Sequence, residues 1–170
     1  MKTKLKWVAC YLLLTIVNFN SISSQEDVSS NRFQFSSISF STFPLEYAFA
    51  DGGMMSTTLD IGFAVRKNLF SIALNGATGI FSTSAHQFNL MYGRELDLGN
   101  RFSTELHIGL GRFSRVRLNR RESSLGIPLM LKVKHTFRKK FSMGFRITGN
   151  KNSVEDLITF GVLFQWDFLK

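Results

Sequence analysis

Glu105 and His107 are the residues best placed to do chemistry, because they lie two positions apart in the chain. In a strand, that spacing puts both side chains on one face, where a carboxylate can orient an imidazole. A nearby serine would complete a nucleophilic Ser-His-Glu arrangement. The other two histidines, His86 and His135, do not give the three a metal-site spacing. The sequence also has no phosphate-binding loop, nucleotide fingerprint or nucleic-acid motif. We therefore expect no enzymatic activity, no metal or other cofactor, and no nucleic-acid partner.

A second group of residues is strongly basic and lies in segment 114–124, which we expect to be a loop. Guanidinium groups can hold phosphate or other anionic groups through paired hydrogen bonds. A solvated loop tip would have the same composition, so both interpretations stay open. The group consists of Arg115, Arg117, Arg120 and Arg121.

Other charged residues alternate with apolar ones along much of the chain. If the face that carries them is enclosed, unpaired charges there would be costly. We therefore predict a hydrogen-bonded ionic network in the interior of the fold. Its expected members are Asp60, Glu95, Glu105, His107, Lys132, Lys134, Arg146 and Asp167.

The elements that would position these residues are β-strands. In the closing segment 157–168, apolar residues alternate with Thr159, Gly161, Gln165 and other mostly polar ones, and a period of two predicts a strand. Similar alternation predicts eight strands in all, with a bulge near Pro44 where the phase of the first one shifts. The expected strands cover residues 33–47, 58–65, 69–81, 88–98, 102–113, 125–137, 141–148 and 157–168.

The connections between these segments alternate between long and short, which is typical of an antiparallel, up-and-down transmembrane β-barrel. A membrane barrel turns its apolar face to lipid and its charges inward, whereas a soluble, lipocalin-like carrier does the reverse. Glycine, alanine and serine on the charged face fit the narrow interior of an eight-stranded barrel. Aromatic residues near the short turns suit a membrane interface. We therefore expect an all-β transmembrane barrel without an open pore, and keep a secreted carrier of an apolar ligand as the alternative.

Residues 1–24 have the pattern of a cleaved signal peptide. Lys2, Lys4 and Lys6 precede an apolar stretch, and small residues follow it near Ser24. Cleavage there would leave residues 25–170 as one barrel domain. It would remove Cys10, the single cysteine, and lower the formal net charge from +9 by three. A basic exported chain favours anionic surfaces.

The signal peptide, the eight-strand meander, the segment Gly126-Ile127-Pro128-Leu129-Met130-Leu131-Lys132 and the aromatic final strand resemble the small outer-membrane β-barrel domain family, with its OmpA/OmpX-like architecture. The resemblance implies a Gram-negative outer-membrane location but no common activity. It also implies contact with outer-membrane lipid, including lipopolysaccharide, and an unidentified protein partner at the extracellular loops is compatible with it. The barrel-assembly machinery would read the terminal strand through Phe160, Phe164, Trp166 and Phe168.

Small barrels that deacylate lipid A offer a third, minor interpretation. These enzymes use serine, histidine and glutamate on the lipid-facing surface near the extracellular rim. His107 is expected to point inward, and the serine spacing of those enzymes is not found at the three histidines.

Overall fold

The computed structural model describes residues 32–49, 53–79, 83–99, 101–118 and 120–169. The predicted signal peptide lies outside these residues. Eight strands make up nearly all of the described chain: β1 Gln34–Phe49, β2 Gly53–Val65, β3 Asn68–Gly79, β4 Ser84–Gly99, β5 Phe102–Arg117, β6 Arg120–Arg138, β7 Phe141–Asn152 and β8 Leu157–Asp167.

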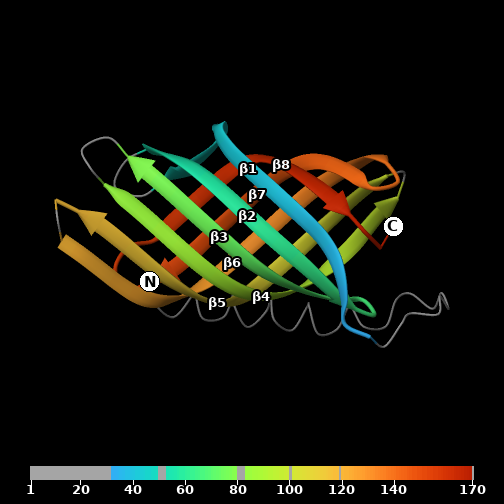
Figure 1. Ribbon diagram of the computed structural model, residues 1–170, viewed down its shortest axis with the longest axis horizontal. Helices are drawn as coiled ribbons and strands as arrows, with labels where there is room; N and C mark the ends of the chain where they lie inside the picture. The colour runs from blue at the N-terminus through green and yellow to red at the C-terminus, as the bar shows by residue number, and fades with distance from the viewer. Residues whose placement is uncertain (1–31, 50–52, 80–82, 100, 119, 170) are drawn as a thin grey trace, which may run out of the picture.

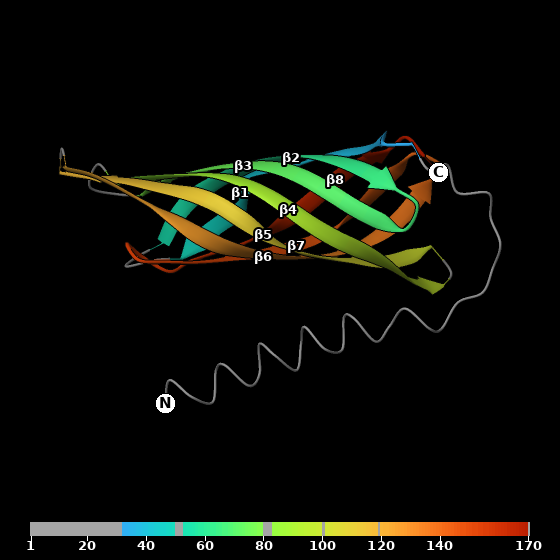
Figure 2. The same cartoon turned by 90° about the horizontal axis from the view of Figure 1, so that it is seen from below.

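The strands form one closed antiparallel barrel, as the alternation predicted. Each strand pairs with the next in sequence, and β1 pairs with β8 to close the sheet. Figures 1 and 2 show the tilted strands wound around one lumen. We call the end that holds the start of β1, the end of β8 and the β2–β3, β4–β5 and β6–β7 connections the terminal end. The opposite end, with the other four connections, is the hairpin end.

At the hairpin end, the strands are longer than predicted. The segments expected as loops at 82–87 and 114–124 are mostly strand, and Arg115 pairs with Glu122 and Arg117 with Arg120 across a tight hairpin. Figure 2 shows this β5–β6 hairpin projecting furthest from the barrel. The predicted long loops are therefore wrong at these two places. Most side chains there are polar, so the alternation of apolar and polar residues is weak, although the backbone still pairs.

The bulge expected near Pro44 is present in β1. The register with β2 shifts between Thr42 and Tyr47, and the register with β8 shifts between Phe40 and Glu46. A bulge of this kind changes which side chains point inward. Beyond it, Glu46 and Ala48 are fully buried.

Pro128 lies inside β6 without a register shift. The β5–β6 pairing extends to Ile108 opposite Leu129 and resumes at Gly111 opposite Gly126 in the same register. Because proline has no N–H to donate to a ladder, a local interruption is the expected consequence. The strand continues on both sides of this interruption without a bulge.

Burial alternates along the strands and defines two faces. In β8, every second residue from Leu157 to Asp167 is buried. On the outer face, aromatic rings contact one another near the terminal end, as in the Phe35–Phe168 pair at 4.7 Å and the Phe141–Trp166 pair at 5.2 Å between centroids. The rings of this aromatic girdle include Phe33, Phe63, Phe70, Tyr92, Phe102, His135 and Phe137.

Candidate functional site: the charged interior and the basic hairpin

Buried apolar side chains gather in the lumen at the hairpin end, and we call this group the apolar plug. Its side chains come from the ends of six strands that meet there, with Val154 packed against them. Phe113 is the largest of them and is completely buried. The apolar plug consists of Ala48, Met54, Ala77, Ala85, Phe113 and Leu157.

An ion pair between Glu46 and Arg146 lies in the lumen below this plug. Arg146 Nη2 is 2.5 Å from Glu46 Oε2, and both side chains are 1% exposed. The other carboxylate oxygen of Glu46 accepts hydrogen bonds from Ser56 Oγ at 2.7 Å and Thr58 Oγ1 at 2.6 Å. Asn75 Nδ2 also donates to it at 3.2 Å. Arg146 therefore occupies the interior as expected, but its partner is one that the sequence did not indicate.

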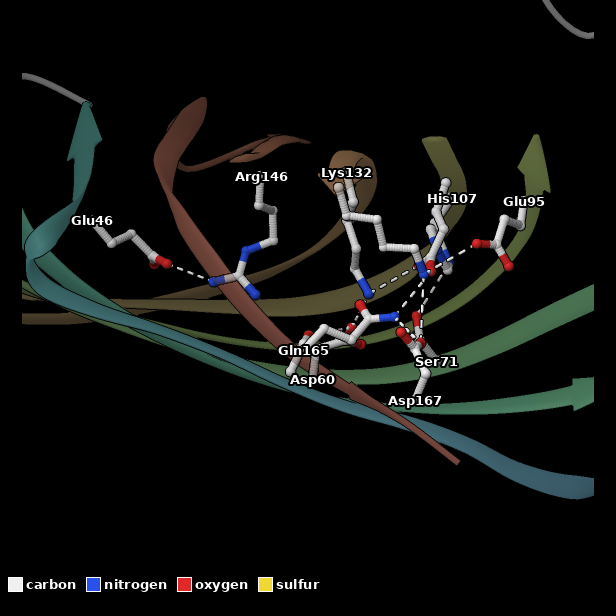
Figure 3. Close-up of polar contacts among 12 residues, drawn as sticks. Glu46, Asp60, Ser71, Glu95, His107, Lys132, Arg146, Gln165 and Asp167 are labelled. Carbon is white, nitrogen blue, oxygen red and sulfur yellow. Dashed lines mark hydrogen bonds and ion pairs between the residues drawn. The ribbon is translucent and has the colours of Figure 1, made fainter. Parts of the chain in front are cut away.

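The ionic cluster nearer the terminal end contains most of the predicted interior network (Figure 3). Lys132 Nζ contacts Asp60 and is 3.2 Å from Glu105 Oε2. Lys134 Nζ contacts Glu105 and is 3.6 Å from Asp167 Oδ1. The two lysines are each 1% exposed, so these charges are neutralised inside the barrel and not by water.

Neutral groups and one further carboxylate complete this cluster. Gln165 Nε2 donates to Glu105 Oε1 at 3.2 Å and to Asp167 Oδ1 at 2.7 Å. Glu95 Oε1 is 3.2 Å from Lys134 Nζ, with its side chain 26% exposed at the edge of the cluster. We call Asp60, Glu95, Glu105, His107, Lys132, Lys134, Gln165 and Asp167 the ionic cluster.

The serine that a nucleophilic arrangement would need does lie beside His107. Ser71 Oγ is 3.4 Å from His107 Nδ1, and His107 Nε2 is 3.1 Å from Glu105 Oε2. Ser71 comes from β3 and is 36 positions away in sequence, so local spacing could not reveal it. Both oxygens of Glu105 also contact lysine ammonium groups. The contacts from Ser71 through His107 to Glu105 are therefore also part of the ionic cluster.

A cavity of about 950 Å³ opens on the terminal-end side of the ionic cluster. Its walls include Ser71, Ser103, Glu105, His107 and Asp167. Arg66, Lys67, Arg94 and Arg101 contribute to its outer part, where the short turns lie. We call this cavity the vestibule.

Three of the four predicted arginines, Arg115, Arg117 and Arg120, share one face of the β5–β6 hairpin, and Arg121 lies on the other. Arg115 is largely buried and its Nη1 is 2.5 Å from Glu155 Oε2 in the β7–β8 connection. Arg117, Arg120 and Arg121 are exposed, and Arg121 Nε donates to Ser114 Oγ at 3.4 Å. The expected four-arginine loop is thus a paired hairpin with three exposed arginines and a fourth that pairs with an acid.

The terminal strand presents its aromatic residues outward. Phe160, Trp166 and Phe168 are between 41% and 48% exposed. Phe164 is half-buried and stacks on Phe40, with the centroids 5.4 Å apart. The strand therefore has an apolar outer edge and a polar inner one.

Within the described residues, no histidine, cysteine, aspartate and glutamate side chains gather in a group of three or more that could hold a metal ion. No helix in the same part of the chain is long and apolar enough to cross a membrane.

Comparison with known proteins shows a shared fold without detectable sequence kinship. No family model and no curated protein matches the sequence. The N-terminal β-barrel domain of Pseudomonas aeruginosa OprF superposes with a TM-score of 0.57 at 11% identity, over 81% of this chain and 100% of that domain. Neisserial surface protein A gives the same TM-score and identity over 84% of this chain and 100% of its own. Ail, the attachment invasion locus protein of Yersinia pestis, gives 0.53 at 10% identity, over 81% of this chain and 99% of its own. The chain thus has the fold of small eight-stranded outer-membrane barrels.

Proposed function

We propose that the protein is a transmembrane barrel of the Gram-negative outer membrane, with a structural or surface-interaction role and no open pore. The observation that carries this proposal is the inversion of the two faces. Leu110 and Leu125 are 71% and 80% exposed on the outside, whereas Lys132 and Asp60 are at most 1% exposed within. In water this arrangement would expose a large apolar surface, and lipid removes that cost.

The secreted-carrier alternative fits the interior poorly. A carrier of an apolar ligand needs an apolar cavity. Here the vestibule has Ser71, Glu105, His107 and Asp167 in its wall beside the ionic cluster, and the apolar plug lies at the other end of the lumen. The aromatic girdle around the terminal end adds a second argument, because amphipathic and aromatic rings favour the membrane interface.

Layers of side chains across the lumen support the absence of an open pore. From the hairpin end, the apolar plug is followed by the Glu46–Arg146 pair and then by Lys132 with its carboxylates. Ala73, Met91 and Met130 form a further small buried cluster. Eight strands leave an interior just wide enough for side chains to fill.

We assign the hairpin end to the outside of the cell. Export through the predicted signal peptide would leave the start of β1 in the periplasm, and β8 ends at the same end of the barrel. The outer aromatic edge of β8 then suits recognition by the barrel-assembly machinery, and the membrane supplies lipopolysaccharide around the hairpins.

The exposed arginines of the β5–β6 hairpin fit an anionic surface group. Arg117 and Arg120 pair directly across the hairpin, so their side chains lie next to each other on one face, while Arg121, the next residue, lies on the other face. Phosphate and sulfate suit such forks. Ail has been crystallised with the heparin analogue sucrose octasulfate. By analogy of fold alone, this supports a polyanion such as the lipopolysaccharide phosphates as the ligand of the hairpin.

Cell fractionation combined with surface proteolysis tests the proposal. Trypsin added to intact cells should cut the β5–β6 hairpin, because Arg117, Arg120 and Arg121 are exposed. The purified protein should need detergent and should migrate differently on gels with and without boiling. An Arg117→Gln/Arg120→Gln/Arg121→Gln variant provides the matched control for cleavage at the hairpin. A soluble monomer without detergent would refute the membrane assignment, and cleavage only after the outer membrane is opened would reverse the orientation.

The proposal includes the absence of catalysis. Overproduction should leave lipid A chemically unchanged, whereas loss of an acyl chain would favour the deacylase interpretation.

A further inference from the structure

We propose that the end of β4 binds an extended peptide segment of a partner protein, which joins the barrel sheet as a short strand with a lysine or arginine between two apolar residues. In the orientation assigned above, this partner lies in the periplasm. The inference goes beyond the proposed function, and it concerns the folded barrel whichever way the barrel faces. It rests on an unpaired strand edge, on the cavity beside that edge and on the side chains around it.

The last residues of β4 have a strand neighbour on one side only. Pairing of β3 with β4 ends at Asn68 opposite Arg94, whereas pairing of β4 with β5 continues to Gly99 opposite Phe102. Within the described residues, no strand therefore pairs with residues 96–99 on the β3 side, and we call this side the open edge. Figure 2 shows the β4–β5 hairpin diverging from the β2–β3 hairpin at the terminal end. An unpaired edge presents backbone N–H and C=O groups that a further strand can use.

Open space adjoins this edge, because the vestibule extends between the two hairpins. Its wall includes Arg66 and Lys67 from the β2–β3 connection, and Leu96, Asp97 and Gly99 from the end of β4. Binding cavities are typically about 300–1,000 Å³, and the vestibule, at about 950 Å³, lies near the top of this range. A strand that enters between the hairpins takes the place in the sheet that β3 leaves beyond its first residue.

The side chains of the open edge specify the kind of peptide. Leu96 and Leu98 are 45% and 64% exposed, and Leu96 continues the outer, apolar face of β4. Asp97 lies on the inner face and is exposed, and its Oδ1 accepts a hydrogen bond from Gly99 N at 2.9 Å. Side chains of neighbouring strands lie beside one another on the same face. Apolar residues at the two outer positions and a lysine or arginine at the inner one therefore match this edge.

Ser103 supplies an independent sign of a ligand at the inner position. It lies directly opposite Asp97 on β5, so both side chains share the inner face. Ser103 is 4% exposed and lines the vestibule, yet its Oγ has no hydrogen-bond partner in the described part of the protein. Buried hydroxyl groups are normally paired, so this one is available to a bound molecule. An ammonium group that crosses Asp97 from the neighbouring strand can donate to both residues.

A second copy of the chain is a poor partner for the open edge. If two such edges pair antiparallel with their apolar residues on one side, Asp97 lies opposite either Asp97 or Glu95 of the other copy. Like charges directly opposite each other destabilise a pair of strands. The edge therefore favours a basic segment from another protein.

Titration of the folded barrel in detergent micelles with the peptide acetyl-Thr-Val-Lys-Val-Thr-amide tests the proposal by amide chemical shifts. The amides of Leu96, Asp97 and Ser103 should shift, and a peptide concentration of about 10 mM should mostly occupy a site of millimolar affinity. The same peptide with glutamate in place of lysine should bind about tenfold more weakly, because like charges then meet.

Methylated peptides test whether the backbone pairs with the open edge. A strand directs the N–H groups of alternate residues to opposite sides, so only one set can reach β4. N-methylation of both valines and N-methylation of the lysine should therefore differ. One of them should weaken binding by about tenfold or more, because hydrogen bonds to β4 are lost, and the other should leave it nearly unchanged.

Two pairs of variants connect the binding to the open edge. Asp97→Asn keeps the acceptor for Gly99 N but should bind the lysine peptide about threefold more weakly, whereas Asp156→Asn, at the hairpin end, should bind it as the unchanged protein does. Ser103→Ala should weaken binding by a similar factor, since one hydrogen bond is lost. Ser41→Ala should not, because Ser41 is equally buried and unpartnered within the described chain but does not line the vestibule. A dispersed amide spectrum shows that each variant is folded.

The proposal is overturned if the folded protein shows no shifts with the lysine peptide, if the glutamate peptide binds equally well, or if the two methylated peptides behave alike. It is also overturned if either pair of variants behaves alike. Shifts at residues 96–99 that depend on the concentration of the barrel without peptide would assign the edge to a second copy, and they too would overturn it.

Discussion

The Glu46–Arg146 ion pair predicts that two substitutions at one contact have unequal effects. Replacing Arg146 by Met leaves the Glu46 carboxylate with its three neutral donors, so about one charge-assisted hydrogen bond is lost. Such a bond stabilises a fold by about 1.5–3 kcal/mol. Replacing Glu46 by Gln leaves a guanidinium group that is 1% exposed without a counter-charge. Breaking a buried pair in this way costs about 3–5 kcal/mol.

Equilibrium unfolding in urea, followed by the gel shift between folded and unfolded barrel, measures these differences. Glu46→Gln should lower the free energy of unfolding more than Arg146→Met does, by about 1–2 kcal/mol. Arg138→Met, at an exposed arginine beside a turn, is the control and should be nearly neutral. The double variant should lose less than the sum of the two single losses, because the two groups interact directly. If Glu46→Gln behaves like the control, or is milder than Arg146→Met, the proposed role of the pair in stability is wrong.

Three further predictions concern the outer and inner faces of the barrel, the close packing of a glycine, and the serine beside His107. Phe168→Asp should reduce the folded fraction recovered from outer membranes, because it places a charge on the lipid face. Gln165→Ala should still insert but should unfold at a lower urea concentration, since two hydrogen bonds to carboxylates are lost. Equal insertion of both variants would mean that the assignment of the two faces is wrong. Gly144→Ala should lower the free energy of unfolding by about 1–3 kcal/mol or more, because its Cβ would lie 1.9 Å from a backbone oxygen of β6. Gly149→Ala, whose Cβ meets nothing within 4 Å, is the matched control in the same unfolding assay. A fluorophosphonate probe should leave Ser71 unlabelled, as determined by mass spectrometry, and labelling that disappears in Ser71→Ala would contradict the absence of catalysis.

The structure gives one residue of the closing strand a specific role. In the sequence, Gln165 is one of the mostly polar residues that alternate with apolar ones in segment 157–168. In the fold it is fully buried and donates to both Glu105 and Asp167. Its removal should therefore weaken the ionic cluster without changing which face meets lipid.

The basic hairpin shows why paired backbone can escape detection. Arg117 and Arg120 flank the tip and belong to β5 and β6, although segment 114–124 was expected to be a loop. Apolar and polar residues alternate along a strand only where its two faces lie in different environments. Where both faces of a hairpin meet water, the side chains need not alternate, and only the hydrogen-bond ladder shows that the strands continue.

The sequence by itself determined the eight strands, the bulge near Pro44 and the assignment of most side chains to one face or the other. These features are local, because a strand alternates every two residues and a closed barrel gives all strands the same two environments. The tertiary structure alone decided which charges meet. Glu46 enters the lumen because the bulge shifts the phase of β1, and Ser71 reaches His107 because β3 and β5 face the same narrow lumen. Pairing across a lumen depends on register and closure, which nothing in a single strand specifies.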